Sequence, residues 1–170
     1  LGLAQWLFDP KNPLTARVYI NRVWQSHFGT GIVETVEDFG TQGAAPTNPE
    51  LLDYLAVEFQ RSGWDMKHMN KLMVMSATYR QNSTVTKEGL EKDPRNFLLA
   101  RGPRYRLPAE TIRDNALMAS GLLVRTVGGD AVFPYQPEKV WDGAGVGIHA
   151  YPDVDMVPKD QMHRRSLYTV

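Results

Sequence analysis

The stretch INRVWQSHFG, residues 20–29, belongs to a helix-forming segment whose apolar residues cover most of the helix circumference. At about 100° per residue, two adjacent lines of the helix surface are apolar apart from one histidine. The first line holds Ala16, Ile20, Val23 and His27, and the neighbouring face holds Leu14, Trp24 and Phe28. Such a helix belongs in the middle of a bundle, so the polar row Arg17, Asn21 and Gln25 is predicted to be at least half-buried.

These polar side chains must find partners, because an unpaired buried polar group costs roughly 1–3 kcal/mol. Two interpretations stay open: an internal hydrogen-bond network that fixes the helix register, or a pocket in which arginine holds an anionic or sugar ligand. Both draw on polar residues of several segments, namely Arg17, Asn21, Gln25, His27, Asp38, Ser76, Arg80, Glu110, Arg113 and Asp114. We expect His27 to be a satisfied core histidine, since no serine, cysteine or second histidine stands at a recognisable spacing from it.

The two arginines Arg17 and Arg80 predict acceptors close by, because a lone buried guanidinium is costly. The candidate carboxylates are Asp9, Asp38, Glu110 and Asp114. In the pocket interpretation, paired carboxylates do acid and base work as in glycoside hydrolysis. That pocket is lined by Arg17, Asn21, Asp38, Arg80 and Glu110.

Composition excludes several classes of function. Lys plus Arg and Asp plus Glu are each 19 in a chain of 170 residues, so the field that steers proteins to nucleic acid is missing. The lack of cysteine excludes disulfides, thiolate zinc sites and covalent haem attachment within this chain. No apolar run approaches the roughly 18 residues of a membrane span. We therefore expect no nucleic-acid partner, no membrane span and no cofactor bound in this chain.

Apolar periodicity and capping signals predict helices at 2–8, 13–28, 48–62, 66–80 and 108–123, with a shorter one after Asp93. Thr47 and Glu50 have the spacing of a capping box, and Asp65 is a candidate N-cap. Gly29 and Gly63 stand where helices end in a left-handed residue. The prediction is a mainly α fold, an irregular bundle of four to five helices.

Residues 124–170 differ in kind, because glycine and proline recur there without a helical period. We predict a single domain with a helical core over 1–123 and an irregular segment over 124–170 that wraps one side of it. The final MHRRSLYTV has no turn or cap to close it, which predicts that the chain continues beyond residue 170.

The segment HAYPDVDMVPKDQMH, residues 149–163, contains histidines and carboxylates that can ligate zinc, manganese or iron. Their spacing matches neither the helical HExxH pair nor a calcium-binding loop. We therefore expect no metal site and keep one candidate ligand set, His149, Asp153, Asp155 and His163.

An ordered series of phrases resembles one uncharacterised family: NPLTARVYINRVWQSHFGTGIVETVEDFGTQG, NPELLDYLAVEF, MSATYRQNS, DPRNFLL, AETIRDNAL, PYQPEKVW and RRSLYT. The chain is similar, over essentially its whole length, to the domain of unknown function 1553. That domain is the C-terminal module of large planctomycete and verrucomicrobial proteins that often carry a cytochrome-c-like domain. The resemblance implies export from the cytoplasm and a domain that continues past RRSLYT. It implies no catalytic residues, because the family has no established activity.

The leading functional prediction is a non-catalytic, extracytoplasmic (periplasmic or cell-surface) docking module of a larger protein. The resemblance implies that haem is bound elsewhere in that protein, and its other domains are the expected partners, with a polysaccharide or cell-surface component as a second possibility. The alternative is a hydrolase or carbohydrate-binding domain that uses the arginine-lined pocket. A further hypothesis is that Trp6, Trp24, Trp64 and Tyr79 relay electrons toward that haem.

Overall fold

A computed structural model describes residues 1–135 and 157–169. Within these residues the regular structure is helical, no strand occurs, and two isolated β-bridges are present. The predicted mainly α fold is therefore confirmed. The chain divides into two compact units, Leu1–Tyr105 (unit 1) and Arg106–Val170 (unit 2). The sequence predicts a core that extends to residue 123, whereas the helix predicted at 108–123 lies in unit 2.

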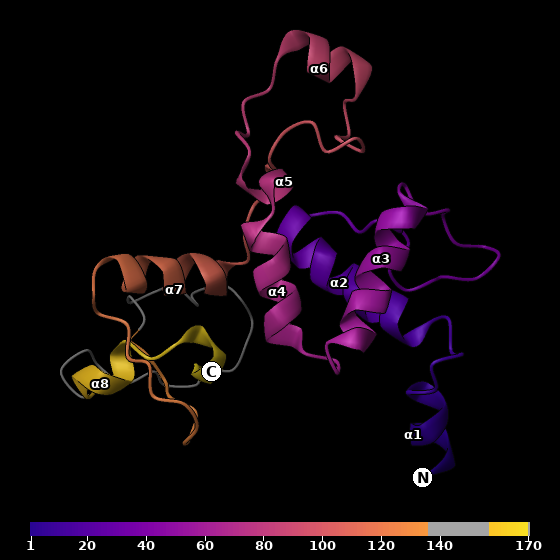
Figure 1. Ribbon diagram of the computed structural model, residues 1–170. Helices are drawn as coiled ribbons and strands as arrows, with labels where there is room; N and C mark the ends of the chain where they lie inside the picture. The colour runs from indigo at the N-terminus through magenta and orange to yellow at the C-terminus, as the bar shows by residue number, and fades with distance from the viewer. Residues whose placement is uncertain (136–156, 170) are drawn as a thin grey trace. The chain divides into compact units, whose positions relative to one another are not determined.

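Unit 1 contains the helices α1 (Gly2–Leu7), α2 (Thr15–Phe28), α3 (Pro49–Arg61), α4 (Met66–Met75), α5 (Ala77–Arg80) and α6 (Lys87–Lys92) (Figure 1). The helices α2, α3 and α4 pack against one another in all three pairs. Their apolar faces and the segment after α2, which supplies Ile32 and Val33, form one buried core: Ala16, Ile20, Trp24, Phe28, Ile32, Val33, Leu52, Leu55, Ala56, Phe59, Met69 and Met73. α2 supplies the first four of these side chains, as its broad apolar surface predicts.

Three helix ends lie where the capping residues of the sequence predict them. Gly29 and Gly63 adopt φ of +83° and +72°, which L side chains rarely adopt, and they follow the C-terminal ends of α2 and α3. The Asp65 carboxylate accepts hydrogen bonds from the backbone N–H groups of Lys67 and His68 and so caps α4. These three predictions are confirmed, and each depends on residues close together in the chain.

Two predicted helix starts in unit 1 are wrong in detail. The N-cap of α3 is Asn48, whose side chain accepts from the Leu51 N–H, whereas Thr47 donates its hydroxyl proton to the Ile32 carbonyl. The predicted capping box of Thr47 therefore does not form, because the helix begins one residue later and Asn48 takes the N-cap position. The helix predicted from residue 13 begins at Thr15, and Asn12 accepts from the Leu14 and Thr15 N–H groups just before it.

The predicted single helix over 66–80 is two helices. Ser76 has an extended backbone (φ −64°, ψ 149°), and its hydroxyl accepts from the Tyr79 N–H, so it ends α4 and caps α5. Serine competes with helix continuation in this way because its hydroxyl reaches nearby backbone groups.

The short helix predicted after Asp93 is also wrong. The Asp93 carboxylate accepts from the Phe97 and Leu98 N–H groups, but Asn96 and Leu99 have positive φ, which a right-handed helix cannot contain. A helix forms earlier instead, at α6, where the Thr86 hydroxyl accepts from the Gly89 N–H.

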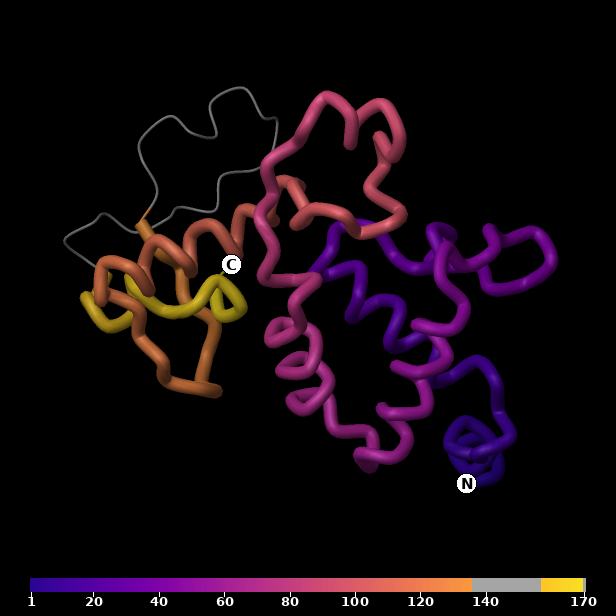
Figure 2. The backbone as a smooth tube through the Cα atoms, turned by 45° about the horizontal axis from the view of Figure 1, so that its top comes forward, coloured from indigo at the N-terminus to yellow at the C-terminus, as the bar shows by residue number. Residues whose placement is uncertain are grey.

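Residues 81–105 form an arm that leaves α5, turns through α6 and returns toward α2 (Figure 2). Two hydrogen bonds close its base: Gly102 N–H to the Asn82 carbonyl at 2.9 Å, and the Gln81 amide to the Leu99 carbonyl at 2.6 Å. At its end the Tyr105 hydroxyl donates to the Ser26 carbonyl of α2 at 2.7 Å. The arm is therefore tied to the helical core at both ends.

The described part of unit 2 contains α7 (Ala109–Ala119), α8 (Lys159–Met162) and the 3₁₀ helix η2 (Ser166–Tyr168) (Figure 1). α7 ends at Ala119, earlier than predicted, and Gly121 follows with φ +75°. Parallel bridges pair Val124 with Arg164 and Val132 with Thr169. Residues 136–156 of the segment predicted to wrap the helices, 124–170, lie outside the described residues.

Candidate functional site

Two of the three residues in the polar row of α2, Arg17 and Asn21, are bonded to other residues of unit 1. Asn21 has no solvent exposure, and its amide exchanges two hydrogen bonds with the backbone of Val33, each 2.9 Å long. This pair holds the segment after α2 against the helix. Gly31 lies beside it, where a Cβ would stand 2.5 Å from the Val33 oxygen and 2.8 Å from the Asn21 amide nitrogen. Glycine is therefore required by close approach.

Arg17 is half-buried and pairs with a carboxylate that is not among the predicted ones. Its Nε donates to Asp53 Oδ1 of α3 at 2.7 Å, and its Nη1 donates to the Pro13 carbonyl at 2.6 Å. The hydrogen bond from Arg17 lowers the pKa of Asp53, opposed by partial burial of the carboxyl and helped by the charge of the arginine. Asp53 and Arg17 lie 36 positions apart in the sequence, so helix packing selects the pair.

The other predicted residues of unit 1 do not converge on this pair. His27 Nε2 lies 2.7 Å from the Asn70 side-chain oxygen, Asp38 accepts from the Gly40 N–H at 2.7 Å, and Ser76 caps α5. Gln25 is half-buried and Arg80 is exposed, and neither side chain has a hydrogen bond within the described residues. The predicted residues of unit 1 are thus distributed over separate local contacts.

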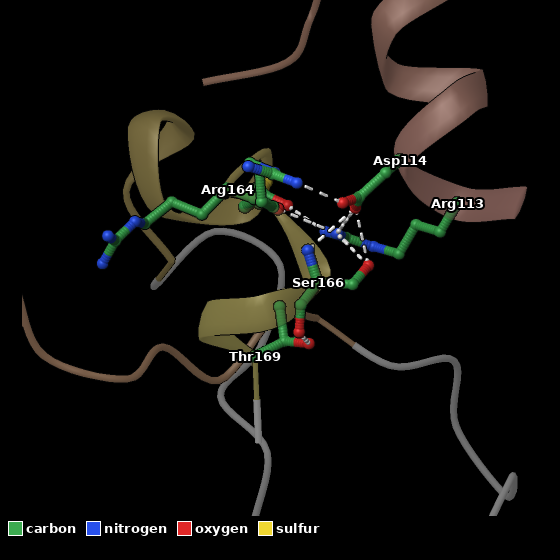
Figure 3. A network of polar contacts seen from close by, with 7 residues as sticks. Arg113, Asp114, Arg164, Ser166 and Thr169 are labelled. Atoms are coloured by element: carbon green, nitrogen blue, oxygen red, sulfur yellow. Dashed lines mark hydrogen bonds and ion pairs between the residues drawn. The ribbon is translucent and has the colours of Figure 1, made fainter. Parts of the chain in front are cut away.

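The predicted residues Arg113 and Asp114 of unit 2 belong to one network, which Figure 3 shows from close by. The Arg113 guanidinium donates to the carbonyls of Met162 and Arg164, each at 2.8 Å, and to the Ser166 hydroxyl at 3.1 Å. Asp114 Oδ1 accepts from the Ser166 N–H and hydroxyl, each at 2.8 Å. The network therefore fastens residues 162–166 to α7. Glu110, the third predicted residue of this helix, is exposed.

The same network shifts the acidity of Asp114, whose side chain is 22% exposed. Burial alone raises the pKa of a carboxyl, but here the two hydrogen bonds from Ser166 and the charges of Arg113 and Arg165 outweigh it. The pKa of Asp114 is consequently below its ordinary value, and the carboxylate is ionised at neutral pH.

Arg164 is buried at 8% exposure and also binds backbone rather than ligand. Its guanidinium donates to the carbonyls of Gly128 and Asp130 and lies over the Tyr168 ring, 4.1 Å from the ring centroid. Its carbonyl accepts from Arg113, so the two arginines belong to one support for the end of the described chain. We interpret this network as structural, because the terminal guanidinium nitrogens of Arg113 and Arg164 donate to backbone carbonyls and to the Ser166 hydroxyl. The buried Arg164 Nε has no hydrogen-bond partner within the described residues.

A cleft in unit 1 is lined by none of the predicted site residues. We call it the arm cleft; it has a volume of about 350 Å³ and lies between the arm, the C-terminal end of α2 and the N-terminal end of α3. Among the described residues, its charged lining consists of Arg95, Arg101 and Arg104, without a carboxylate, lysine or histidine. The sequence signal for it is local: RNFLLARGPRYR, residues 95–106, carries four arginines and no acidic residue.

The aromatic wall of the arm cleft includes Tyr105, whose pKa is raised by burial and, to a lesser degree, by neighbouring Tyr79. The tyrosine therefore stays protonated at neutral pH and keeps its hydrogen bond to the Ser26 carbonyl. The cleft thus offers positive charge and apolar walls, and no group that acts as a general base near neutral pH.

Metal ligation is described only in part. Among residues 1–135 and 157–169, no group of three or more histidine or acidic side chains is arranged to hold a metal ion. Three members of the candidate ligand set, His149, Asp153 and Asp155, lie outside the described residues, and His163 lies within them. None of the helices in the described part of the chain is both long and apolar enough to cross a membrane.

Comparison with protein-family models matches residues 1–170 to PSD1, described as a protein of unknown function (DUF1553). No curated protein and no solved structure matches the chain.

Proposed function

From the premise that the chain belongs to the PSD1 (DUF1553) family, we propose that it acts as a non-catalytic docking module of a larger, extracytoplasmic protein. Its partners are the other domains of that protein, including a haem-binding region. The cellular location and the haem-bearing neighbour rest on the resemblance to planctomycete and verrucomicrobial proteins.

The observation that carries this proposal is that three of the predicted site residues, Arg17, Asn21 and Asp114, are bonded to other groups of the same chain. The Asn21 amide is hydrogen-bonded to the backbone of Val33, and Arg17 forms an ion pair with Asp53. The Asp114 carboxylate accepts a hydrogen bond from the Ser166 N–H. An active site needs converging titratable groups at a surface that substrate can reach. The arm cleft has cationic and apolar lining instead, which supports binding rather than bond cleavage.

A binding experiment tests the proposal directly. The chain and the upstream part of its parent protein are produced separately and mixed, and their association is measured by calorimetry and analytical ultracentrifugation. We expect a stoichiometric complex and no turnover of chromogenic glycosides or esters by the chain alone. Turnover that is lost in Arg17→Met and Asp38→Asn variants with unchanged melting temperatures would establish the hydrolase alternative and overturn the docking proposal.

The proposed location is tested separately. In whole cells, an impermeant amine-reactive label should modify the exposed lysines Lys87 and Lys92 of the intact parent protein. Labelling only after cell lysis would place the module in the cytoplasm and contradict the extracytoplasmic proposal.

A further inference from the structure

The arm cleft carries positive charge that the described residues neutralise only in part. Its three arginines differ in their partners: Arg95 pairs with Glu34, whereas Arg101 and Arg104 have no ion pair within the described residues. The chain as a whole has zero formal net charge, so this concentration of cations is local. Local positive charge in a concave site is suited to one or two anionic groups rather than to a long polyanion.

The guanidinium of Arg101 is fixed in position before any ligand binds. One of its terminal nitrogens donates to the Asp93 carbonyl at 3.1 Å and to the Pro94 carbonyl at 2.9 Å. Its backbone is held by Asn96, which exchanges hydrogen bonds of 3.3 and 2.8 Å with the N–H and carbonyl of Arg101. These carbonyls leave its charge uncompensated, and a positioned arginine loses less entropy on binding a carboxylate.

The remaining lining combines the polar Thr30, Thr47, Asn48 and Asn96 with apolar side chains, some of which are accessible. Leu90 and Phe97 of the arm have 53% and 37% of their surface exposed. The Arg95 guanidinium lies over the Phe97 ring, 4.6 Å from the ring centroid. Opposite the arm, Leu51 of α3 and Ile32 line the cleft. Apolar side chains of a ligand therefore find contacts next to the arginines. A volume of about 350 Å³ lies near the lower end of the usual range for binding pockets, about 300–1,000 Å³.

We infer that the arm cleft binds a short acidic segment of the docking partner, in which carboxylates alternate with apolar side chains. Arg101 and Arg104 pair with the carboxylates, while Leu90 and Phe97 pack against the apolar side chains. This inference rests on the proposed docking function, because a docking module meets its ligand as part of another protein. The same anionic chemistry is available from a free organic acid or from phosphate, and the experiment separates these sources.

The test uses isothermal titration calorimetry with a capped peptide, Glu-Leu-Glu-Phe-Glu, and its neutral counterpart, Gln-Leu-Gln-Phe-Gln. The acidic peptide should bind, and the neutral one should bind several-fold to about 30-fold more weakly, because two exposed charged pairs contribute at most about 1 kcal/mol each. Raising the salt concentration from about 50 to 500 mM should weaken binding of the acidic peptide, since salt screens the attraction between exposed charges. Equal affinities for the two peptides would overturn the inference.

Substitutions assign the binding to the cleft. Arg104→Met should weaken binding of the acidic peptide about 3- to 5-fold. It should not affect folding, since Arg104 is exposed and has no hydrogen bond or ion pair within the described residues. Arg101→Met should weaken it more, and Arg101→Lys should restore part of the loss because lysine keeps the charge without the planar fork. The matched control is Arg61→Met, an exposed arginine of α3 outside the cleft. The same loss in Arg61→Met as in Arg104→Met would contradict the assignment.

Further measurements distinguish the possible sources of the ligand and separate the cleft proposal from the docking proposal. Benzoate, inorganic phosphate or a short single-stranded oligonucleotide that binds as tightly as the acidic peptide would overturn the peptide assignment. If the upstream domains bind the chain and the Arg101→Met, Arg104→Met double variant equally well, docking stands and the arm cleft is not its site. If the acidic peptide binds while the upstream domains do not, the cleft assignment stands and the docking proposal fails.

Discussion

The two units of the chain are stabilised by different means. In unit 1, apolar side chains of α2, α3 and α4 meet in one buried core, and the polar pair of Asn21 and Val33 is enclosed beside it. In the described part of unit 2, the buried residues are two valines, Val132 and Val157, with the polar Arg164 and Ser166. Unit 1 therefore owes its stability mainly to burial of apolar surface, and the described part of unit 2 depends on hydrogen bonds and charges around α7.

This difference has a consequence for how each unit responds to change. Loss of apolar burial depends little on pH, whereas a network centred on a carboxylate weakens when that carboxylate is protonated. Substitutions that act on one unit should also leave the other largely unchanged if the two are separate cooperative units. Hydrogen exchange followed by mass spectrometry reads each unit through its own peptides.

The largest expected effect is loss of core volume in unit 1. Ile20 is fully buried, so Ile20→Ala should reduce the free energy of unfolding of unit 1 by about 2–5 kcal/mol. Hydrogen exchange in α2, α3 and α4 should accelerate accordingly, while exchange in α7 changes much less. Leu14→Ala, at a position 47% exposed, is the control and should have a small effect. An equal acceleration of hydrogen exchange in both units would show that they unfold together and are not separate cooperative units.

A second large effect is expected from a single added methyl group. Gly31→Ala should destabilise unit 1 by about 1–3 kcal/mol, because the new Cβ would stand 2.5 Å from the Val33 oxygen and must displace the backbone bonded to Asn21. Thermal unfolding monitored by circular dichroism measures the shift. Gly2→Ala, where no atom lies within 4 Å of the added carbon, is the matched control. An unchanged melting temperature for Gly31→Ala would mean that the bonded pair of Asn21 and Val33 is not rigidly held.

The pH dependence sharpens the contrast between the units. The pKa of Asp114 is lower in the folded protein than its unfolded value of about 4, so its contribution is present above that value and is lost as pH falls toward the folded pKa. Below about pH 4, protection of α7 and of residues 162–166 should therefore fall before protection of α2, after correction for the intrinsic exchange rate.

Asp114→Asn provides the test of that assignment. The variant should destabilise unit 2 by about 1 kcal/mol at neutral pH, because it removes the charge that faces Arg113 and Arg165. It should also show a weaker loss of protection on acidification. Asp160→Asn, at an exposed position of α8, is the control and should keep the parental pH dependence. A parental pH profile in Asp114→Asn would place the sensitive group elsewhere.

The smallest expected effect concerns the ion pair between α2 and α3. Both partners are substantially exposed, with side-chain fractions of 34% for Arg17 and 55% for Asp53, so solvent screens the pair. Arg17→Met should lower the stability of unit 1 by less than about 1 kcal/mol in urea unfolding. A loss comparable with that of Ile20→Ala would mean that the α2 polar row matters as much as the core.

Local signals explain which parts of unit 1 are predictable from sequence. The Asp65 cap and the glycines after α2 and α3 act on neighbours a few positions away, and the apolar pattern of α2 needs no partner to be recognised. The break at Ser76 is not predicted because serine is compatible with two structures: it can lie inside a continuous helix, or its hydroxyl can cap a new helix. That choice depends on where the chain must turn.

The candidate sites are less predictable for the same reason. Sequence reasoning singles out Arg17, Arg113 and Asp114, but it cannot supply Asp53 or Ser166 as their partners across 36 and more than 50 positions. It also passes over Arg101 and Arg104, because an arginine-rich turn becomes a cleft only when the arm folds back to α2 through Tyr105.

The sequence by itself determines that the chain is mainly helical, that α2 is apolar over most of its circumference, and where several helices begin and end, because these properties depend on spacing within a few turns. The tertiary structure alone decides which polar groups are paired, which arginines face a cleft, and how the chain divides into two units. Those outcomes depend on contacts between residues far apart in the chain, whose free energy exists only once the helices have packed.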